Sequence, residues 1–193
     1  MGTRSAERLV PVVGIGASAG GLQAVTKLLK NLSADTGMAY VFVPHLSPDH
    51  VSLLAEILAK ATSMPVADAR DGTAVLADHV YIMPPNVGIS IAAGVLHLAT
   101  RPAGAAGFRP IDSFFRSLAE DQKASAVGIV LSGTLSDGTL GLKAIKTGGG
   151  ITFAQDEQSA IHSGMPHSAI ASGCVDFVLT PEQIAQKLAT LGA

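Results

Sequence analysis

Short apolar runs alternate with amphipathic stretches of helix length along most of the chain, and this alternation constrains the fold more than any other feature. It is typical of a parallel β-sheet covered by helices on both faces, because parallel strands are joined by crossover helices. We therefore predict an α/β fold built on a three-layer, doubly wound, mostly parallel sheet. Strands are predicted at 12–17, 39–44, 65–68, 126–131, 151–154 and 175–179, and helices at 20–30, 50–61, 111–123, 138–146, 166–171 and from residue 181.

The alternation is interrupted between residues 71 and 99. Turn signals such as Asp71-Gly72 and Ala93-Gly94 bracket three short β segments, predicted at 79–83, 88–92 and 95–99. These segments predict a small antiparallel excursion with a short hairpin at one edge of the sheet. Residues 101–109 are predicted to form an irregular loop that could cover a site.

The composition fits one compact domain. Of 193 residues, 48% are hydrophobic, 15% are charged and 21 are glycine, which is typical of an aliphatic core joined by tight turns and excludes a coiled coil or a disordered chain. A net charge of −2 provides no basic surface for nucleic acid, and no apolar run approaches the roughly 18 residues of a membrane span. The one cysteine, Cys174, favours a cytoplasmic location and is predicted to be a small buried side chain.

The pentapeptide Gly16-Ala17-Ser18-Ala19-Gly20 lies at the end of the first predicted strand and has two interpretations. Small residues on both sides of Ser18 let the chain turn sharply into a helix and expose the hydroxyl as a candidate nucleophile. Read from residue 14, the same glycines approximate a dinucleotide fingerprint, whose backbone N–H groups hold a pyrophosphate. That fingerprint requires an acidic residue at the end of the second strand, where this chain has Pro44-His45, so the nucleophile is favoured.

Two further polar side chains are predicted at the same edge of the sheet. His45 follows the second strand, and Asp137 lies in the loop after the strand at 126–131. Because the carboxyl ends of parallel strands meet at one edge, Ser18, His45 and Asp137 are expected to face one crevice. An imidazole that takes the serine proton, and a carboxylate that holds the imidazole, are the groups that activate a serine. Their order along the chain, with the serine after the first strand, disfavours an ordinary α/β-hydrolase fold.

Each of these side chains also has a purely structural interpretation. Ser18 is a favoured residue to cap the first helix, and Asp137 before a glycine is typical of a turn. A histidine such as His45 is, taken alone, more often a hydrogen-bonded structural residue. Their joint placement at strand ends favours a catalytic triad.

These residues lie in motifs that resemble the catalytic domain of the chemotaxis protein-glutamate methylesterases, the CheB family. The resemblance covers nearly all of the chain. Its motifs are Ile15-Gly16-Ala17-Ser18-Ala19-Gly20-Gly21, Pro44-His45, Asp71-Gly72, the segment 79–85, Arg109-Pro110-Ile111-Asp112, the segment 131–138 and Gly164-Met165-Pro166. The sequences of segments 133–142 and 111–121, taken together, most resemble those of methylesterase domains that are fused to a methyltransferase, the CheB/CheR fusions.

The resemblance implies a serine hydrolase that demethylates glutamyl methyl esters on chemoreceptor signalling helices and deamidates certain glutamines. Ser18 would attack the carbonyl, His45 would act as general base and then acid, and Asp137 would orient His45. It implies no metal and no organic cofactor. The backbone N–H groups predicted to stabilise the oxyanion are those of Ala19, Gly20, Thr134 and Leu135, and the side chains predicted to contact substrate are Arg109 and Met165.

Two departures from the family pattern bear on these expectations. Ala19 and Thr134 stand where many chemotaxis members have Thr and Met, so only backbone donors are expected there. Family members also commonly carry an N-terminal receiver domain, whereas here residues 1–10 are a tail and 1–193 are expected to be one methylesterase domain without a receiver.

The predicted partners are methylated chemoreceptor helices, with a methyltransferase or receiver domain in cis or in trans. Neither nucleic acid binding nor direct membrane insertion is expected. Two alternatives remain at this point: a catalytically silent CheB-like interaction module and, less favoured, a nucleotide-binding Rossmann domain.

Overall fold

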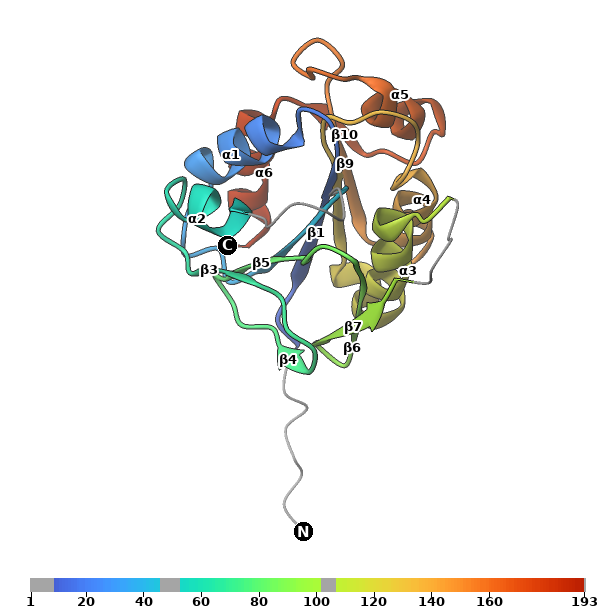
Figure 1. Cartoon of the computed structure of the whole chain (residues 1–193). Coiled ribbons are helices and arrows are strands. Elements are labelled where there is room, and N and C mark those ends of the chain that lie inside the picture. The colour runs from blue at the N-terminus through green and yellow to red at the C-terminus, as the bar shows by residue number, and fades with distance from the viewer. Residues whose placement is uncertain (1–8, 46–52, 102–106, 193) are drawn as a thin grey trace.

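The computed structural model describes residues 9–45, 53–101 and 107–192, which fold into three layers around a parallel sheet (Figure 1). Within these residues the sheet has seven strands in the order β10-β9-β8-β1-β2-β5-β3, and every pair is parallel. The strands are β1 (Val12–Ala17), β2 (Ala39–Pro44), β3 (Val66–Asp68), β5 (Val80–Ile82), β8 (Val127–Val130), β9 (Ile151–Gln155) and β10 (Phe177–Leu179).

Helices cover both faces of this sheet and enclose two cores (Figure 1). One face carries α1 (Gly21–Asn31), α2 (Leu54–Ala59) and α6 (Pro181–Leu191), and the other carries α3 (Pro110–Gln122), the short 3₁₀ turn η1 (Lys123–Ser125), α4 (Thr139–Thr147) and α5 (Gly164–Ala171). Because side chains alternate along a strand, Val13 and Ile15 of β1 pack toward α1, whereas Val12 packs in the core beside α3. None of the helices in the described ranges is long and apolar enough to cross a membrane.

A second, antiparallel sheet lies beneath α3. It consists of β4 (Thr73–Ala74), β7 (Val95–Thr100) and β6 (Val87–Ala92), in that order. The β6–β7 hairpin turns at Ala93-Gly94, which have φ angles of 51° and 71°, and two positive φ angles are what a two-residue hairpin loop requires. Ile89 and Ile91 of β6 are buried in the same core as Phe114 of α3, so this small sheet supports α3 on the side away from β1.

The predicted α/β class and the doubly wound sheet are confirmed, and the predicted bounds of β1 and β2 agree with the structure. Two segments differ. Residues 73–74 form a strand, β4, that was not predicted. Residues 79–83 were expected in the antiparallel excursion, but β5 pairs in parallel with β2, with Val80 opposite Tyr40. A strand of three residues flanked by turns carries no signal for the neighbour it pairs with. The start of the predicted helix at 50–61 and residues 102–106 of the predicted loop lie outside the described residues.

The glycines that suggested a dinucleotide fingerprint have a packing role within β1. A Cβ on Gly14 would lie 2.8 Å from Phe115 Cε1, and one on Gly16 would overlap the side chain of Ile111. Both positions therefore lie under α3 and let this helix approach the strand closely. They face α3 and not a space in which a pyrophosphate could lie, which argues against the nucleotide-binding alternative.

Helix α4 touches α3 at Gly141, and this contact yields a stability prediction. A Cβ at this position would overlap Phe115 Cβ and lie 3.1 Å from the Asp112 Cα. Gly141→Ala is therefore expected to lower the free energy of unfolding by about 1–3 kcal/mol, although alanine ordinarily stabilises a helix interior. Urea unfolding measures the effect. Gly148→Ala, at the C-terminal cap of the same helix with no atom nearer than 3.5 Å, is the matched control and should unfold close to the parent. A Gly141→Ala protein as stable as the parent would contradict the close contact.

Candidate active site

The carboxyl ends of three adjacent strands, β8, β1 and β2, meet at the candidate site. In the β1–β2 register Ala17 lies opposite Pro44, so Ser18 and His45 are the next residues on neighbouring strands. The His45 N–H donates to the Ala17 carbonyl oxygen at 3.0 Å, which extends the ladder to this point. Since neighbouring strands lie about 4.8 Å apart, the backbones of Ser18 and His45 are adjacent.

The side chain of His45 is bound to the side chain of Asp137. The distance from His45 Nε2 to Asp137 Oδ2 is 2.6 Å, and the histidine side chain is 36% exposed whereas that of the aspartate is 6% exposed. An ionised carboxylate only accepts hydrogen bonds, so Nε2 carries the proton of a neutral imidazole. Nδ1 is then the ring nitrogen with a free lone pair, and it can accept a proton.

Asp137 is held by backbone N–H groups as well as by His45. Its Oδ2 accepts from the N–H of Ile111 at 3.1 Å, and its Oδ1 accepts from the N–H groups of Asp112 at 3.0 Å and Gly138 at 2.9 Å. Pro110 is at the first position of α3, and the next N–H groups of a helix have no partner within the helix. The carboxylate therefore lies at the positive end of α3.

These contacts set the charge of Asp137. Burial alone would raise the pKa of this carboxyl, but the hydrogen bond from His45, those from the N–H groups of Asp112 and Ile111, and the charge of His45 together hold the pKa below its ordinary value. Asp137 is therefore ionised at neutral pH, which is the state that can hold the imidazole.

Arg109 ties the Asp137 loop to the start of α3. Its Nε lies 2.7 Å from Asp112 Oδ2 and 3.7 Å from Asp137 Oδ1. The contact with Asp112 is an ion pair whose atoms are not aligned as in a hydrogen bond. Its Nη2 donates to the carbonyl oxygen of Ser136 at 2.5 Å and to its hydroxyl at 3.1 Å. The guanidinium is thus engaged by groups of the site itself, and the predicted contact of Arg109 with substrate stays a prediction.

Asp112 is a buried partner that sequence reasoning did not assign to the site. Its Oδ1 accepts from the Gly141 N–H at 2.8 Å, which fixes the α3–α4 contact. Burial and the nearby charge of Asp137 raise the pKa of Asp112. The hydrogen bond from the Gly141 N–H and the charge of Arg109 oppose this increase, but the pKa stays above its ordinary value. The sequence pattern that could have indicated Asp112 is its position two residues after Pro110, the proline that begins α3.

Ser132, two residues after β8, joins the loops around Ser18 and was not predicted from the sequence. Its carbonyl oxygen accepts from the Ser18 N–H at 3.0 Å, and its hydroxyl donates to the Ala19 carbonyl oxygen at 2.8 Å. The same hydroxyl accepts from the His162 N–H at 3.0 Å. Gly20 has a φ of 74°, and a Cβ there would lie 2.7 Å from this hydroxyl, so the turn after Ser18 requires glycine. These contacts fix the backbone on which Ser18 stands.

The N–H groups predicted to stabilise an oxyanion lie on both sides of Ser18. A Cβ placed on Gly133 would be 3.0 Å from Ser18 Cβ, which sets the loop with Thr134 and Leu135 beside the serine. Among the described residues, the N–H groups of Ala19, Gly20, Thr134 and Leu135 donate to no protein acceptor, whereas that of Gly133 donates to the His162 carbonyl oxygen at 2.9 Å. The four predicted donors are therefore available, and their role stays a prediction.

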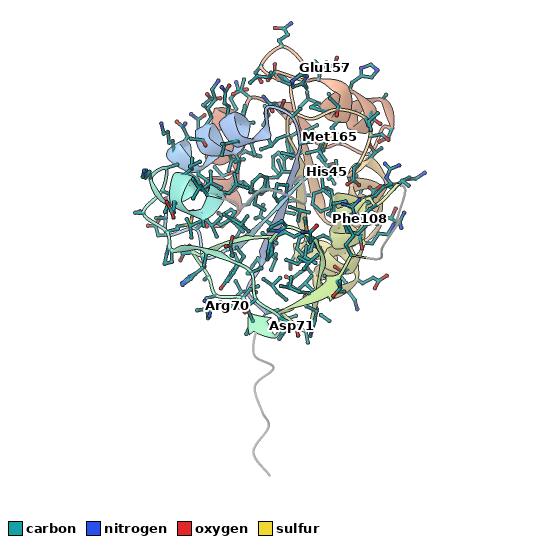
Figure 2. The ribbon with its side chains drawn as sticks, in the orientation of Figure 1. His45, Arg70, Asp71, Phe108, Glu157 and Met165 are labelled. Atoms are coloured by element: carbon teal, nitrogen blue, oxygen red, sulfur yellow. The ribbon has the colours of Figure 1, made fainter. Side chains whose placement is uncertain are left out.

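Met165 supports this loop from beneath. Its side chain is fully buried, its N–H donates to the Gly133 carbonyl oxygen at 2.9 Å, and a Cβ on Gly133 would overlap its sulfur. Contact of Met165 with a substrate requires the loop to move, so this prediction stays untested. Figure 2 shows Met165 and His45 in the same part of the molecule, away from Arg70 and Asp71 at the opposite end. Cys174 is buried, as expected.

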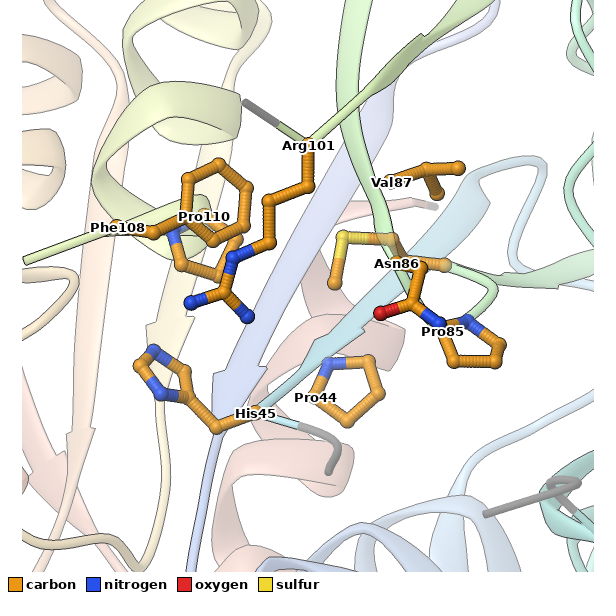
Figure 3. A pocket seen from close by; sticks show the side chains of 9 residues that line it. Pro44, His45, Pro85, Asn86, Val87, Arg101, Phe108 and Pro110 are labelled. Atoms are coloured by element: carbon orange, nitrogen blue, oxygen red, sulfur yellow. The ribbon is translucent and has the colours of Figure 1, made fainter. Parts of the chain in front are cut away.

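A small pocket of about 70 Å³ opens beside His45 (Figure 3). The Arg101 guanidinium lies over the Phe108 ring at 4.9 Å from its centre, and Figure 3 shows it directed toward His45. Neither residue was assigned a role from the sequence, because they flank a segment with no periodic pattern. The pocket is lined by Pro44, His45, Met83, Pro85, Asn86, Val87, Arg101, Phe108 and Pro110. Its size suits the end of one side chain, since small-molecule cofactor pockets are about 300–1,000 Å³.

Residues 13–188 match the family model of the CheB methylesterases. The chain belongs to the CheB methylesterase family. The solved CheB methylesterase catalytic domain of Thermotoga maritima has the same fold: it superimposes with a TM-score of 0.85 at 30% identity, over 94% of this chain and 98% of that domain. The family resemblance and the fold predicted from the sequence are both confirmed.

Two relatives carry the name Protein-glutamate methylesterase/protein-glutamine glutaminase. The group 3 operon protein of Rhizobium meliloti (strain 1021) is 36% identical over 183 residues, which are 94% of this chain and 52% of that protein. Protein 2 of Burkholderia pseudomallei (strain K96243) is 40% identical over 185 residues, or 95% of this chain and 54% of that protein. The chain therefore spans about half the length of these relatives.

The lowered pKa of Asp137 makes stability depend on pH. A carboxyl whose pKa is lower in the folded than in the unfolded protein stabilises the fold above the unfolded value, about 3.9, and this stabilisation is lost as pH falls through the folded value. Asp137→Asn is therefore expected to be less stable than the parent by about 1–3 kcal/mol at pH 7, with a difference that shrinks below about pH 4. Urea unfolding at steps from pH 7 to pH 3 measures this.

Asp68→Asn, on the exposed edge strand β3, reports the ordinary effect of losing an aspartate. A constant difference between parent and Asp137→Asn across this pH range would contradict the proposed stabilisation by the ionised carboxylate.

Proposed function

We propose that this chain hydrolyses glutamyl methyl esters on chemoreceptor proteins, and the corresponding glutamine amides, by acyl transfer to Ser18. The observation that carries the proposal is the 2.6 Å hydrogen bond between His45 and the buried Asp137, on the strand next to Ser18. An ionised carboxylate that holds an imidazole beside an accessible hydroxyl is the arrangement that serine hydrolases use. The names of the relatives supply the ester and amide substrates.

The first step is attack of Ser18 Oγ on the ester carbonyl carbon. His45 takes the serine proton at Nδ1, because Nε2 is engaged by Asp137, and the carboxylate stabilises the imidazolium that forms. Within the described residues the Ser18 hydroxyl makes no hydrogen bond, so its contact with His45 has to form when substrate enters. Catalytic hydrogen bonds commonly tighten only in the substrate complex.

The remaining steps follow from the same groups. Negative charge on the carbonyl oxygen is stabilised by the N–H groups of Ala19, Gly20, Thr134 and Leu135, which have no competing protein acceptor among the described residues. His45 returns its proton to the methoxy oxygen, and methanol leaves an acyl-serine. Water, deprotonated by His45, then attacks this acyl group and releases a glutamate side chain. With a glutamine, the leaving group is ammonia.

The network around Asp137 also favours turnover over a silent interaction module. The Asp137 carboxylate is surrounded by four hydrogen-bond donors and the Arg109 guanidinium. Burying such a charged network costs free energy, and a hydrophobic residue in its place often stabilises the folded protein at least as well. A module that only bound a partner would gain nothing from aiming this carboxylate at an exposed histidine. Regulation by a receiver domain, a methyltransferase partner and a cytoplasmic location remain predictions.

Methanol release from a methylated chemoreceptor fragment tests the proposal. The parent chain should release methanol, Ser18→Ala should lose activity by about 10⁶-fold, and Asp137→Asn should lose about 10⁴-fold because the imidazole loses its fixed tautomer. Ser33→Ala, an exposed serine after α1, is the matched control and should keep the parent rate. Equal rates for parent and Ser18→Ala would exclude the serine mechanism, and no release by the parent would favour the silent module.

A further inference from the structure

Leu135 combines two costly features beside the candidate site. Its side chain is 84% exposed, the highest value among the exposed large apolar residues that the structure describes. Its backbone has a φ of 64°, in the left-handed region that a leucine rarely adopts. An exposed apolar side chain in a strained backbone gains nothing from the fold of this domain.

The other non-glycine residues with positive φ in the described ranges have an ordinary explanation. Asp78 and Asn86 are of the types that tolerate this conformation, Ala93 is in the β6–β7 turn, and Lys123 directly follows α3. Leu135 lies in neither a hairpin turn nor a helix cap. Glycine would adopt its conformation without strain, and the chain has glycines at nearby positions of the same loop. The leucine side chain therefore has a use outside the domain's own packing.

The loop holds Leu135 in a fixed position. On one side, Gly133 is bound to His162 and Met165 through its N–H and carbonyl, each at 2.9 Å. On the other side, Ser136 is bound by the Arg109 guanidinium. The side chain thus projects from an anchored base, two residues before Asp137.

A second exposed apolar side chain lies on the neighbouring loop. Ile161 is 54% exposed, and a Cβ on Gly20 would be 2.8 Å from Ile161 Cβ, so this side chain covers the turn after Ser18. The Gly133–His162 hydrogen bond joins the two loops. Leu135 and Ile161, which we call the apolar rim, therefore lie on two hydrogen-bonded loops that flank the serine: Leu135 is two residues from Gly133, whose Cβ would be 3.0 Å from Ser18 Cβ.

We propose that the apolar rim contacts the protein substrate, by binding an apolar side chain that lies within one helical turn of the modified residue. This inference rests on the proposed function and names a specificity determinant of the same site. Contact between two exposed apolar side chains removes both from water, which favours segments that carry leucine near the ester. A small ester has no neighbouring apolar side chain to place on the rim, so the preference appears only with peptide or protein substrates.

The test uses two synthetic helix-forming peptides, each with one glutamate γ-methyl ester. One peptide has leucine four residues before and four residues after the ester, where a helix places them on the same face, and the other has serine at both positions. The readout is the ratio of kcat/KM for the two peptides, from methanol release. A change in catalytic power alters both rates alike and leaves this ratio unchanged.

The parent is expected to prefer the leucine peptide by about tenfold, the preference expected from burying one leucine side chain. Leu135→Ala and Leu135→Gly should both bring the ratio close to one, and Ile161→Ala should reduce it in part. Leu76→Ala, a 56% exposed leucine after β4, is the control and should keep the parent ratio. The melting temperature of Leu135→Gly should also be about 2–4 °C higher than that of Leu135→Ala, because glycine relieves the backbone strain.

A parent that hydrolyses both peptides equally, or a Leu135→Ala protein that keeps the tenfold preference, would overturn the role of the rim while leaving the esterase intact. A parent that hydrolyses neither peptide, and no methylated receptor fragment either, would overturn the proposed function and this inference with it.

Discussion

The buried carboxylate of Asp137 joins parts of the molecule that are far apart in the sequence. Its two oxygens accept from the ring of His45 directly after β2, from the first free N–H groups of α3 and from the N–H before α4. An ionised carboxylate is costly to bury unless its oxygens are bonded in this way. The site therefore exists only when β2, α3 and the loop after β8 are all in place, and the geometry of the candidate triad is coupled to the packing of the whole domain.

That packing depends on small residues where α3 crosses the sheet and its neighbouring helix. Gly14 and Gly16 let α3 approach β1, and Gly141 lets α4 approach α3. Pro110 then starts the helix at the height of the strand ends, so that its N–H groups point at Asp137. The antiparallel sheet supports α3 from the opposite side through β6. The glycines of the first strand thus have a structural task, whereas the glycine after Ser18 shapes the turn that presents the hydroxyl.

Much of the site could be predicted from strand ends. Ser18, His45 and Asp137 each follow an apolar run, and the rule that parallel strands end at a common edge is enough to bring them together. The rule does not predict which donors surround the carboxylate. Arg109 illustrates the limit: the sequence did not predict that its guanidinium is bound by Asp112 and Ser136, and its predicted contact with substrate stays a prediction. Such pairings depend on side-chain directions that periodicity does not encode.

The sequence by itself determined the α/β class, the bounds of the first two strands and the three residues of the candidate triad, because these depend on local periodicity and on general rules of parallel sheets. Only the tertiary structure decided that β5 joins the parallel sheet, that Ser132 and Asp112 hold the site together, and that Leu135 projects from a strained backbone beside Ser18. These features depend on contacts between segments far apart in the sequence, such as the contact of Ser132 with Ala19, which are 113 positions apart. Local sequence patterns do not encode which distant segments meet, because that depends on how the intervening helices and strands pack together.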